Sequence, residues 1–137
     1  MHYQAVYQKI DYKRYQFLRQ QSRLSPKTDE AARLGMENSL CCVAILDGDN
    51  DNEIVGMGRI VGDGACHFQV VDICVLPEHQ KKGLGKLIMQ KLDEYMDSNL
   101  PDSCYVSLIA DGPAFQLYAQ YGFKEVWPAS RGMGRTF

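Results

Sequence analysis

The segment QKKGLGK, residues 80–86, combines three lysines with two glycines immediately before a helical pattern. Gly83 and Gly85 let the backbone expose successive N–H groups at a helix start, and such groups attract an anion such as a phosphate. A strand-to-helix turn with solvated lysines has the same composition, so the segment is compatible with both. Neither a P-loop, which needs GxxxxGK[ST], nor a GxGxxG dinucleotide motif, whose third glycine would replace Ile88, is present.

A single carboxylate, Asp72, interrupts the apolar run VVDICV that precedes the glycine bend. Burial disfavours the charged form of a carboxylate, so Asp72 is a candidate general base. The alternatives are a structural carboxylate that is hydrogen-bonded to neighbouring strands or loops, and a carboxylate that binds substrate without proton transfer. Glu37, His67 and an ordered water are rival candidates for the base.

Length and composition restrict the classes of protein to consider. The 137 residues are 45% hydrophobic, which suits a single domain over residues 1–137. A net charge of −2 provides no overall basic field for nucleic acid or an anionic membrane. Five cysteines without CxxC spacing and three scattered histidines predict neither a disulfide framework nor a metal site. With no signal-peptide core and no run of about 18 apolar residues, we expect a cytoplasmic location.

Apolar periodicity and turn residues predict a mixed α/β chain. Runs of β-branched and apolar residues separated by Asp, Asn and Gly clusters predict an antiparallel meander, and the apolar spacing after Leu84 follows one helix face. The predicted strands are 3–8, 41–46, 53–61, 67–75, 104–110 and, near the C-terminus, FKEVWP (123–128) and GMGRTF (132–137). The predicted helices are 11–23, 28–38, a long one from Leu84 to near Pro101, and 112–122.

These motifs, in this order, resemble the GNAT (GCN5-related N-acetyltransferase) superfamily. The family pattern V-x-P-x-x-[QR]-x-x-G-x-[GA] matches Val75, Pro77, Gln80, Gly83 and Gly85. LYAQYGF, residues 117–123, matches the family segment F/L-Y-x-x-x-G-F. The resemblance implies a twisted, mostly antiparallel mixed sheet of six or seven strands, flanked by about four helices, with strands 4 and 5 splayed apart.

The resemblance also implies acetyl-coenzyme A as cosubstrate. In the family, amides of the glycine bend hold the pyrophosphate, and the pantetheine arm lies between the splayed strands, where it pairs with backbone. The matching pyrophosphate positions are Gln80, Lys81, Lys82, Gly83, Leu84, Gly85 and Lys86, and the matching pantetheine positions are Ile73, Cys74 and Val75. Asp111 follows the fifth strand, where the family often has an asparagine near the cofactor arm.

Tyr118 matches the family tyrosine that points at the cofactor sulfur, which implies that it assists the leaving thiolate. A phenol of pKa about 10 is a weaker acid than a thiol near 8.5, so we expect hydrogen bonding rather than complete proton transfer. The acceptor must lose a proton, because a lysine-like amine is neutral in only about one molecule in 2,500 at pH 7. Asp72 is the candidate acceptor of that proton. A covalent role for Cys74 lacks a recognisable paired histidine.

The predicted function is an acetyl-CoA-dependent N-acetyltransferase that acetylates a primary amine of a small molecule or a protein by direct attack, through a tetrahedral intermediate. A non-catalytic acyl-CoA-binding regulatory module is the alternative. The acceptor, the base and the exact acyl group stay open, because the first 40 residues, strand 53–61 and the tail PASRGMGRTF resemble the family least. The C-terminal strands could also pair across subunits in a homodimer.

Overall fold

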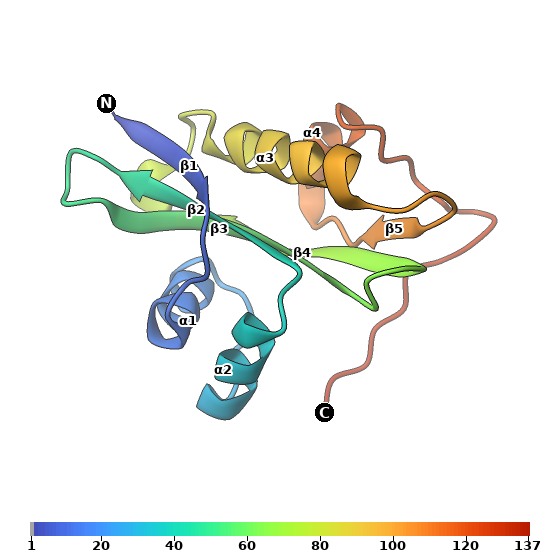
Figure 1. Cartoon of the computed structure of the whole chain (residues 1–137), viewed down its shortest axis with the longest axis horizontal. Helices are drawn as coiled ribbons and strands as arrows, with labels where there is room; N and C mark the ends of the chain where they lie inside the picture. The colour runs from blue at the N-terminus through green and yellow to red at the C-terminus, as the bar shows by residue number, and fades with distance from the viewer. Residues whose placement is uncertain (1) are drawn as a thin grey trace.

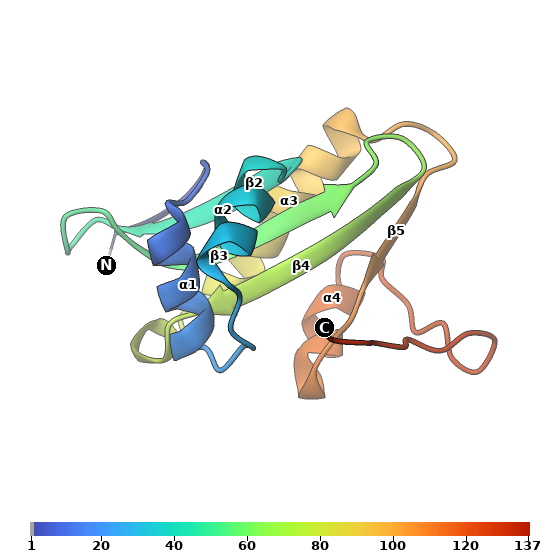
Figure 2. The ribbon, with the colours of Figure 1, turned by 90° about the horizontal axis from the view of Figure 1, so that it is seen from below.

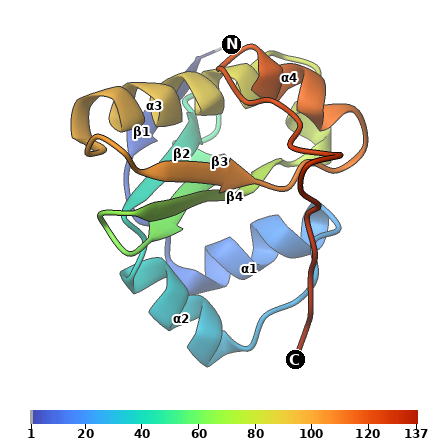
Figure 3. The ribbon, with the colours of Figure 1, turned by 90° about the vertical axis from the view of Figure 1, so that its right-hand side faces the viewer.

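The computed structural model describes residues 2–137 as a five-stranded sheet between two helical layers (Figure 1). The strands are β1 (Tyr3–Tyr7), β2 (Cys41–Asp47), β3 (Glu53–Gly62), β4 (His67–Val75) and β5 (Tyr105–Leu108). The helices are α1 (Tyr12–Gln21), α2 (Asp29–Glu37), α3 (Leu84–Asn99) and α4 (Phe115–Ala119), with short 3-10 turns at Pro77–His79 and Gly112–Ala114. Helices α1 and α2 cover one face of the sheet, and α3 and α4 lie on the other (Figures 1 and 3).

The sheet has the order β1-β2-β3-β4-β5 and contains both kinds of pairing. The pairs β1–β2, β2–β3 and β3–β4 are antiparallel, whereas β5 is parallel to β4 because α3 carries the chain back across the sheet. The mixed α/β class, the four helices and the first five predicted strands are therefore confirmed.

Strands β4 and β5 stay paired along only part of their length. Their register runs from His67 opposite Tyr105 to Val70 opposite Leu108, and there the pairing ends. β4 continues to Val75, while the chain after β5 turns away toward α4, so that the two strands diverge (Figure 2). The second half of β4 consequently has a neighbouring strand on one side only.

Helix α3 anchors the β4–β5 crossover to the sheet. Its buried side chains, Leu84, Ile88, Met89 and Leu92, recur at helical spacing and form one apolar face. The sheet admits this close approach at Gly58, where an added Cβ would lie 2.7 Å from Cγ2 of Ile88. Within residues 2–137, no helix is long and apolar enough to cross a membrane.

The prediction of two C-terminal strands is wrong. Residues 123–128 and 132–137 form no strand, so the described sheet has five strands rather than six or seven. Their β-branched and aromatic composition favours extended backbone, but a strand also needs a hydrogen-bonding partner. Within residues 2–137 the tail makes a local turn instead, in which the N–H of Ser130 donates to the carbonyl of Val126 at 2.9 Å.

Candidate active site

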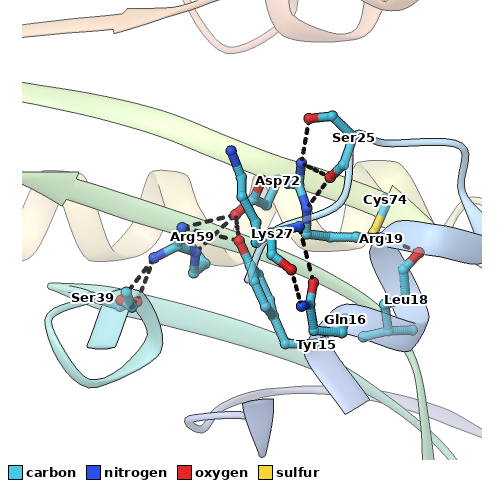
Figure 4. A network of polar contacts seen from close by, with 11 residues as sticks. Tyr15, Gln16, Leu18, Arg19, Ser25, Lys27, Ser39, Arg59, Asp72 and Cys74 are labelled. Atoms are coloured by element: carbon cyan, nitrogen blue, oxygen red, sulfur yellow. Dashed lines mark hydrogen bonds and ion pairs between the residues drawn. The ribbon is translucent and has the colours of Figure 1, made fainter. Parts of the chain in front are cut away.

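A β-bulge at Asp72 marks the place where β5 leaves β4. Val71 pairs with Arg59 and Cys74 pairs with Met57, so two residues of β4, Asp72 and Ile73, stand opposite Gly58 alone. Asp72 has φ +59°, in the left-handed region that non-glycine residues seldom adopt. The extra residue bends β4 and directs the Asp72 side chain toward α1 (Figure 4).

The side chain of Asp72 is only 10% exposed, and each of its carboxylate oxygens has at least one donor. Its Oδ2 accepts a hydrogen bond from the Tyr15 hydroxyl at 2.6 Å and from Arg59 Nε at 2.9 Å, and Arg19 Nη1 pairs with Oδ1 (Figure 4). Burial and the hydrogen bond to Asp72 raise the pKa of Tyr15 to about 12, so this phenol stays a donor. The contacts favour the structural alternative for Asp72, whose role as a base stays a prediction.

The two arginines extend this network into the helical layer. Arg59 Nη1 donates to the carbonyl of Gly35 and to the hydroxyl of Ser39, each at 2.9 Å. Arg19 Nε donates to the carbonyl of Ser25 at 3.0 Å. The bulge on β4 is thus connected to the C-terminal end of α2 and to the loop between α1 and α2. A substitution of Asp72 is therefore expected to weaken the attachment of both elements to the sheet.

A cleft of about 180 Å³ lies at the point where β4 and β5 separate. Tyr118 from α4 is half-buried in it, and burial followed by the nearby carboxylate of Asp111 raises the pKa of this phenol. Tyr118 therefore keeps its proton at neutral pH, and its hydroxyl can donate a hydrogen bond. The cleft is lined by Leu24, Val70, Val71, Asp72, Ile73, Leu108, Ile109, Asp111, Ala114 and Tyr118.

A second cleft, of about 340 Å³, lies toward the C-terminal end of β4. It adjoins the first cleft, because Leu24 and Ile73 line both. Its lining is Ser22, Leu24, Ile73, Cys74, Val75, His79, Gln80, Lys81, Gly83, Leu84 and Gly85. The structure therefore brings most of the predicted cofactor residues to one continuous groove. Lys82 and Lys86 are exposed and outside both linings.

The backbone of β4 presents open hydrogen-bonding groups to this groove. The N–H of Leu76 donates to the carbonyl of Val55 on β3 at 2.9 Å. Because backbone groups alternate in direction along a strand, Ile73 and Val75 face the side that β5 has left. The side chain of Gln80 folds back to this edge, where Nε2 donates to the carbonyl of Val75 at 3.0 Å.

The glycine bend forms the far end of the groove. Gly83 is the N-cap of α3, has φ +78° and provides no side-chain hydrogen bond to the helix. Lys81 also has a positive φ, of 62°. The first N–H groups of α3 have no partner inside the helix and no side-chain cap, and the helix dipole adds partial positive charge there. This end of the groove is suited to an anion.

Cys74 is unsuited to nucleophilic chemistry. Its side chain is buried, and its sulfur lies 3.9 Å from the carbonyl oxygen of Leu18. Burial raises the pKa of the Cys74 thiol to about 11, whereas nucleophilic cysteines have lowered values. The thiol stays protonated near pH 7, and the backbone of Cys74 pairs with Met57 on β3 instead of facing the groove.

Several residues of the site were missed from the sequence. Tyr15, Arg19 and Arg59 surround Asp72, and Leu24 joins the two clefts. One signal was available, because Arg59 is the single charge among the apolar residues that follow Glu53 in β3. The rival bases Glu37 and His67, both among the described residues 2–137, belong to neither cleft lining.

A family model described as an acetyltransferase (GNAT) domain matches residues 37–125, which is more than half of the chain. The chain belongs to the GNAT acetyltransferase family. The matched range includes β4, the glycine bend, α3, β5 and Tyr118, so both clefts are built mainly from GNAT-matched residues. Leu24, which joins the two clefts, precedes the matched range.

Solved structures share this GNAT fold over nearly the whole chain. A Staphylococcus aureus protein of unknown function, described as a probable acetyltransferase, is 40% identical, with 99% of this chain and 100% of that chain covered and a TM-score of 0.90. A GNAT family acetyltransferase from Streptococcus pneumoniae is 25% identical, with 99% and 98% covered and a TM-score of 0.77. The first 40 residues, where the sequence resembles the family least, thus belong to the shared fold.

Among curated proteins, GCN5-related N-acetyltransferase 2, chloroplastic, from Arabidopsis thaliana is 33% identical over 89 residues. That match covers 64% of this GNAT chain and 34% of the plant protein. The matched segment therefore spans about a third of the length of this relative.

Proposed function

We propose that this GNAT chain is an acetyl-CoA-dependent N-acetyltransferase that acetylates a primary amine by direct attack. The observation that carries the proposal is the second half of β4, which has β3 on one side and no strand on the other. This open side leads from the cleft of Tyr118 to the start of α3, which has no side-chain cap. A pantetheine arm in extended conformation can pair with Ile73 and Val75 as a strand would. Its pyrophosphate would then meet the amides of the glycine bend.

The chemistry of the proposed step needs few side chains. The neutral amine nitrogen attacks the thioester carbonyl carbon and the C–N bond forms. The attached nitrogen then loses a proton to solvent, the C–S bond breaks, and coenzyme A leaves as a thiolate. The Tyr118 hydroxyl, kept protonated by its raised pKa, donates a hydrogen bond to that thiolate. The outward N–H of Ile73, which lines the same cleft as Tyr118, is available to the oxyanion of the tetrahedral intermediate. Positioning the amine against the thioester supplies much of the acceleration, up to about 7–11 kcal/mol in favourable cases.

The acceptor amine arrives mostly protonated and must lose that proton to become a nucleophile. We assign Asp72 to positioning, because Arg19, Arg59 and Tyr15 already occupy its oxygens. Asp111 lines the same cleft and forms no ion pair within residues 2–137, so its carboxylate can attract a cationic amine. The proton then passes to water in the cleft.

A panel of amines, including small polyamines, amino sugars and peptide N-termini, tests the proposed function. With acetyl-CoA present, we expect at least one amine to release free thiol at a rate that depends on amine concentration. Coenzyme A should also raise the melting temperature, whereas ATP and NAD should not. Tight coenzyme A binding without turnover on any amine would replace the proposal with a non-catalytic acyl-CoA-binding module.

Gly83→Ala tests the glycine bend as the pyrophosphate site. A Cβ at Gly83 meets nothing within 4 Å, so the substitution acts through the positive φ alone and costs about 1–2 kcal/mol. If the bend relaxes, its amides lose their alignment, and the Kd for coenzyme A should rise about tenfold, equivalent to 1.4 kcal/mol. Isothermal titration calorimetry measures this change.

Gly64→Ala provides the matched control. Gly64 has φ +84° and equally open surroundings, but it lies in the turn between β3 and β4. Both variants should lose similar stability in urea unfolding, and only Gly83→Ala should weaken coenzyme A binding. Equal affinities in the two variants would exclude the bend from the cofactor site.

A further inference from the structure

Two cysteines stand at the starts of the paired strands β4 and β5. Cys66 directly precedes His67, the first residue of β4, and Cys104 directly precedes Tyr105, the first residue of β5. In the parallel register His67 lies opposite Tyr105. One step back along both strands, Cys66 therefore lies opposite Cys104. The spacing of the cysteines in the sequence does not indicate this pair, because only the register brings residues 66 and 104 together.

Backbone hydrogen bonds hold the two cysteine positions next to each other. The N–H of Tyr105 donates to the carbonyl of Cys66 at 2.9 Å, as in the ladder between neighbouring parallel strands. Asp63 fixes the backbone before β4, because its Oδ1 accepts from the N–H groups of Cys66 and His67 at 2.8 and 3.1 Å. The turn before β4 and the start of β5 thus lie side by side (Figure 2).

This arrangement suits a disulfide. Neighbouring strands lie about 4.8 Å apart, and the Cα atoms of a disulfide are separated by about 4.4–6.8 Å. Cys104 packs against the hydrophobic core, as do Val106 and Leu108 at every second position after it. Side chains opposite each other in a parallel pair share a face of the sheet, so the register directs Cys66 to the rim of that same face. Little backbone movement is needed to join the two sulfurs.

The pair differs from the other three cysteines in its exposure. Cys66 is exposed and Cys104 is half-buried, whereas Cys41, Cys42 and Cys74 are buried. Burial raises the pKa of Cys41 to about 12 and that of Cys42 to about 11, so these two thiols stay protonated. An oxidant in solution therefore reaches Cys66 first, and Cys104 is the thiol beside it.

We propose that Cys66 and Cys104 form a redox-modification site, at which a peroxide converts the two thiols into a disulfide between β4 and β5. The Cys66 thiolate attacks one oxygen of hydrogen peroxide, the O–O bond breaks, and a sulfenic acid and hydroxide form. The hydroxide takes up the proton that Cys66 released. The Cys104 thiol then attacks the Cys66 sulfur, the S–O bond breaks, and water leaves as the S–S bond forms. Two thiols are oxidised, and one peroxide is reduced to two waters.

The disulfide would close a loop from residue 66 to residue 104. This loop contains β4, the glycine bend and α3, and with them most of the residues that line the second cleft. Closing a loop lowers the entropy of the unfolded chain and so stabilises the folded state. The pair lies at the end where β4 and β5 are hydrogen-bonded, so the open end of the groove keeps its shape. The proposal does not depend on the acetylation chemistry.

Treatment of the full-length chain with a few equivalents of hydrogen peroxide tests the proposal without an activity assay. The number of free thiols, measured after denaturation, should fall by two from the five of the reduced chain. Peptide mass mapping should find Cys66 linked to Cys104. The melting temperature should rise by about 10 °C, and dithiothreitol should reverse all of these changes.

Cys104→Ser separates the roles of the two thiols. Without its partner, Cys66 should stop at the sulfenic acid, which dimedone labels, and the melting temperature should not rise. Cys66→Ser, a change at an exposed position, should keep all of its remaining thiols. Cys41→Ala is the control, because it removes a buried thiol outside the pair and should still lose two thiols on oxidation. Circular dichroism before treatment confirms that each variant is folded.

Three results would overturn the proposal. The first is retention of all five thiols in the unchanged chain after treatment. The second is a disulfide that joins other cysteines, and the third is a disulfide that joins two chains, which a non-reducing gel detects.

Discussion

Replacing Tyr118 by phenylalanine should lower kcat about 100-fold, at the low end of the range for a positioned proton donor. The hydroxyl is the only group removed, and burial together with Asp111 keeps it protonated by raising its pKa. The donor is therefore present when the thiolate develops, and its hydrogen bond is made in the transition state rather than to the bound thioester. The Kd for acetyl-CoA should stay close to that of the unchanged protein.

Tyr121→Phe is the control for this result. Tyr121 lies three residues further along, and its hydroxyl donates to the carbonyl of Lys86 at 3.2 Å, outside the cleft of Tyr118. The control loses the same atom and should retain nearly full kcat in single-turnover measurements with a reactive amine. A loss of kcat shared equally by both variants would assign Tyr118 to packing of α4.

Local signals were sufficient to predict the elements that carry the cofactor groove. The glycine bend, the apolar spacing after Leu84 and the run before Pro77 each depend on neighbouring residues, and the structure has β4 and α3 where they were expected. The divergence of β4 from β5 followed only from the resemblance to the family. No periodicity in a single strand indicates where its neighbour stops.

The environment of Asp72 could not be predicted, because its partners come from distant parts of the chain. Arg19 is 53 residues away and Arg59 is 13 residues away. The bulge that turns the Asp72 side chain toward them is an extra residue in a run that otherwise looks like ordinary strand. An apolar context suggested a buried carboxylate, but only the tertiary fold supplied two guanidinium partners.

The C-terminal tail shows that local composition can also predict an element that does not form. Residues 132–137 have strand-like composition, but sheet formation also requires an unpaired edge within reach. The edge exists at β5, but the C-terminal end of the chain lies on the α1 and α2 side of the sheet (Figures 1 and 3). The composition of this segment predicted a strand that the chain does not form.

Asp72→Asn should lower the free energy of unfolding by about 3–5 kcal/mol, the usual cost of removing one partner from a buried ion pair. The Asp72 side chain is 10% exposed, and those of Arg19 and Arg59 are 6% and 11% exposed. A neutral amide would leave two buried guanidinium groups without a counter-charge. Urea unfolding measures the loss, and Asp111→Asn, which removes a carboxylate without an ion pair, should change stability by less than about 0.5 kcal/mol.

The same substitution separates a positioning role from a catalytic base. If Asp72 only holds the bulge to α1 and α2, adding Arg19→Met should recover part of the lost stability, because one buried charge disappears with its partner. The acid limb of the kcat/KM profile should then keep its midpoint in Asp72→Asn, even though the rate falls. A general base would give the opposite pattern, since its removal abolishes that limb while the fold stays nearly as stable. Tyr15 and Arg59 both donate to Oδ2 and Arg19 pairs with Oδ1, and these contacts favour the first outcome, because protonation of Asp72 would weaken its ion pairs with both arginines.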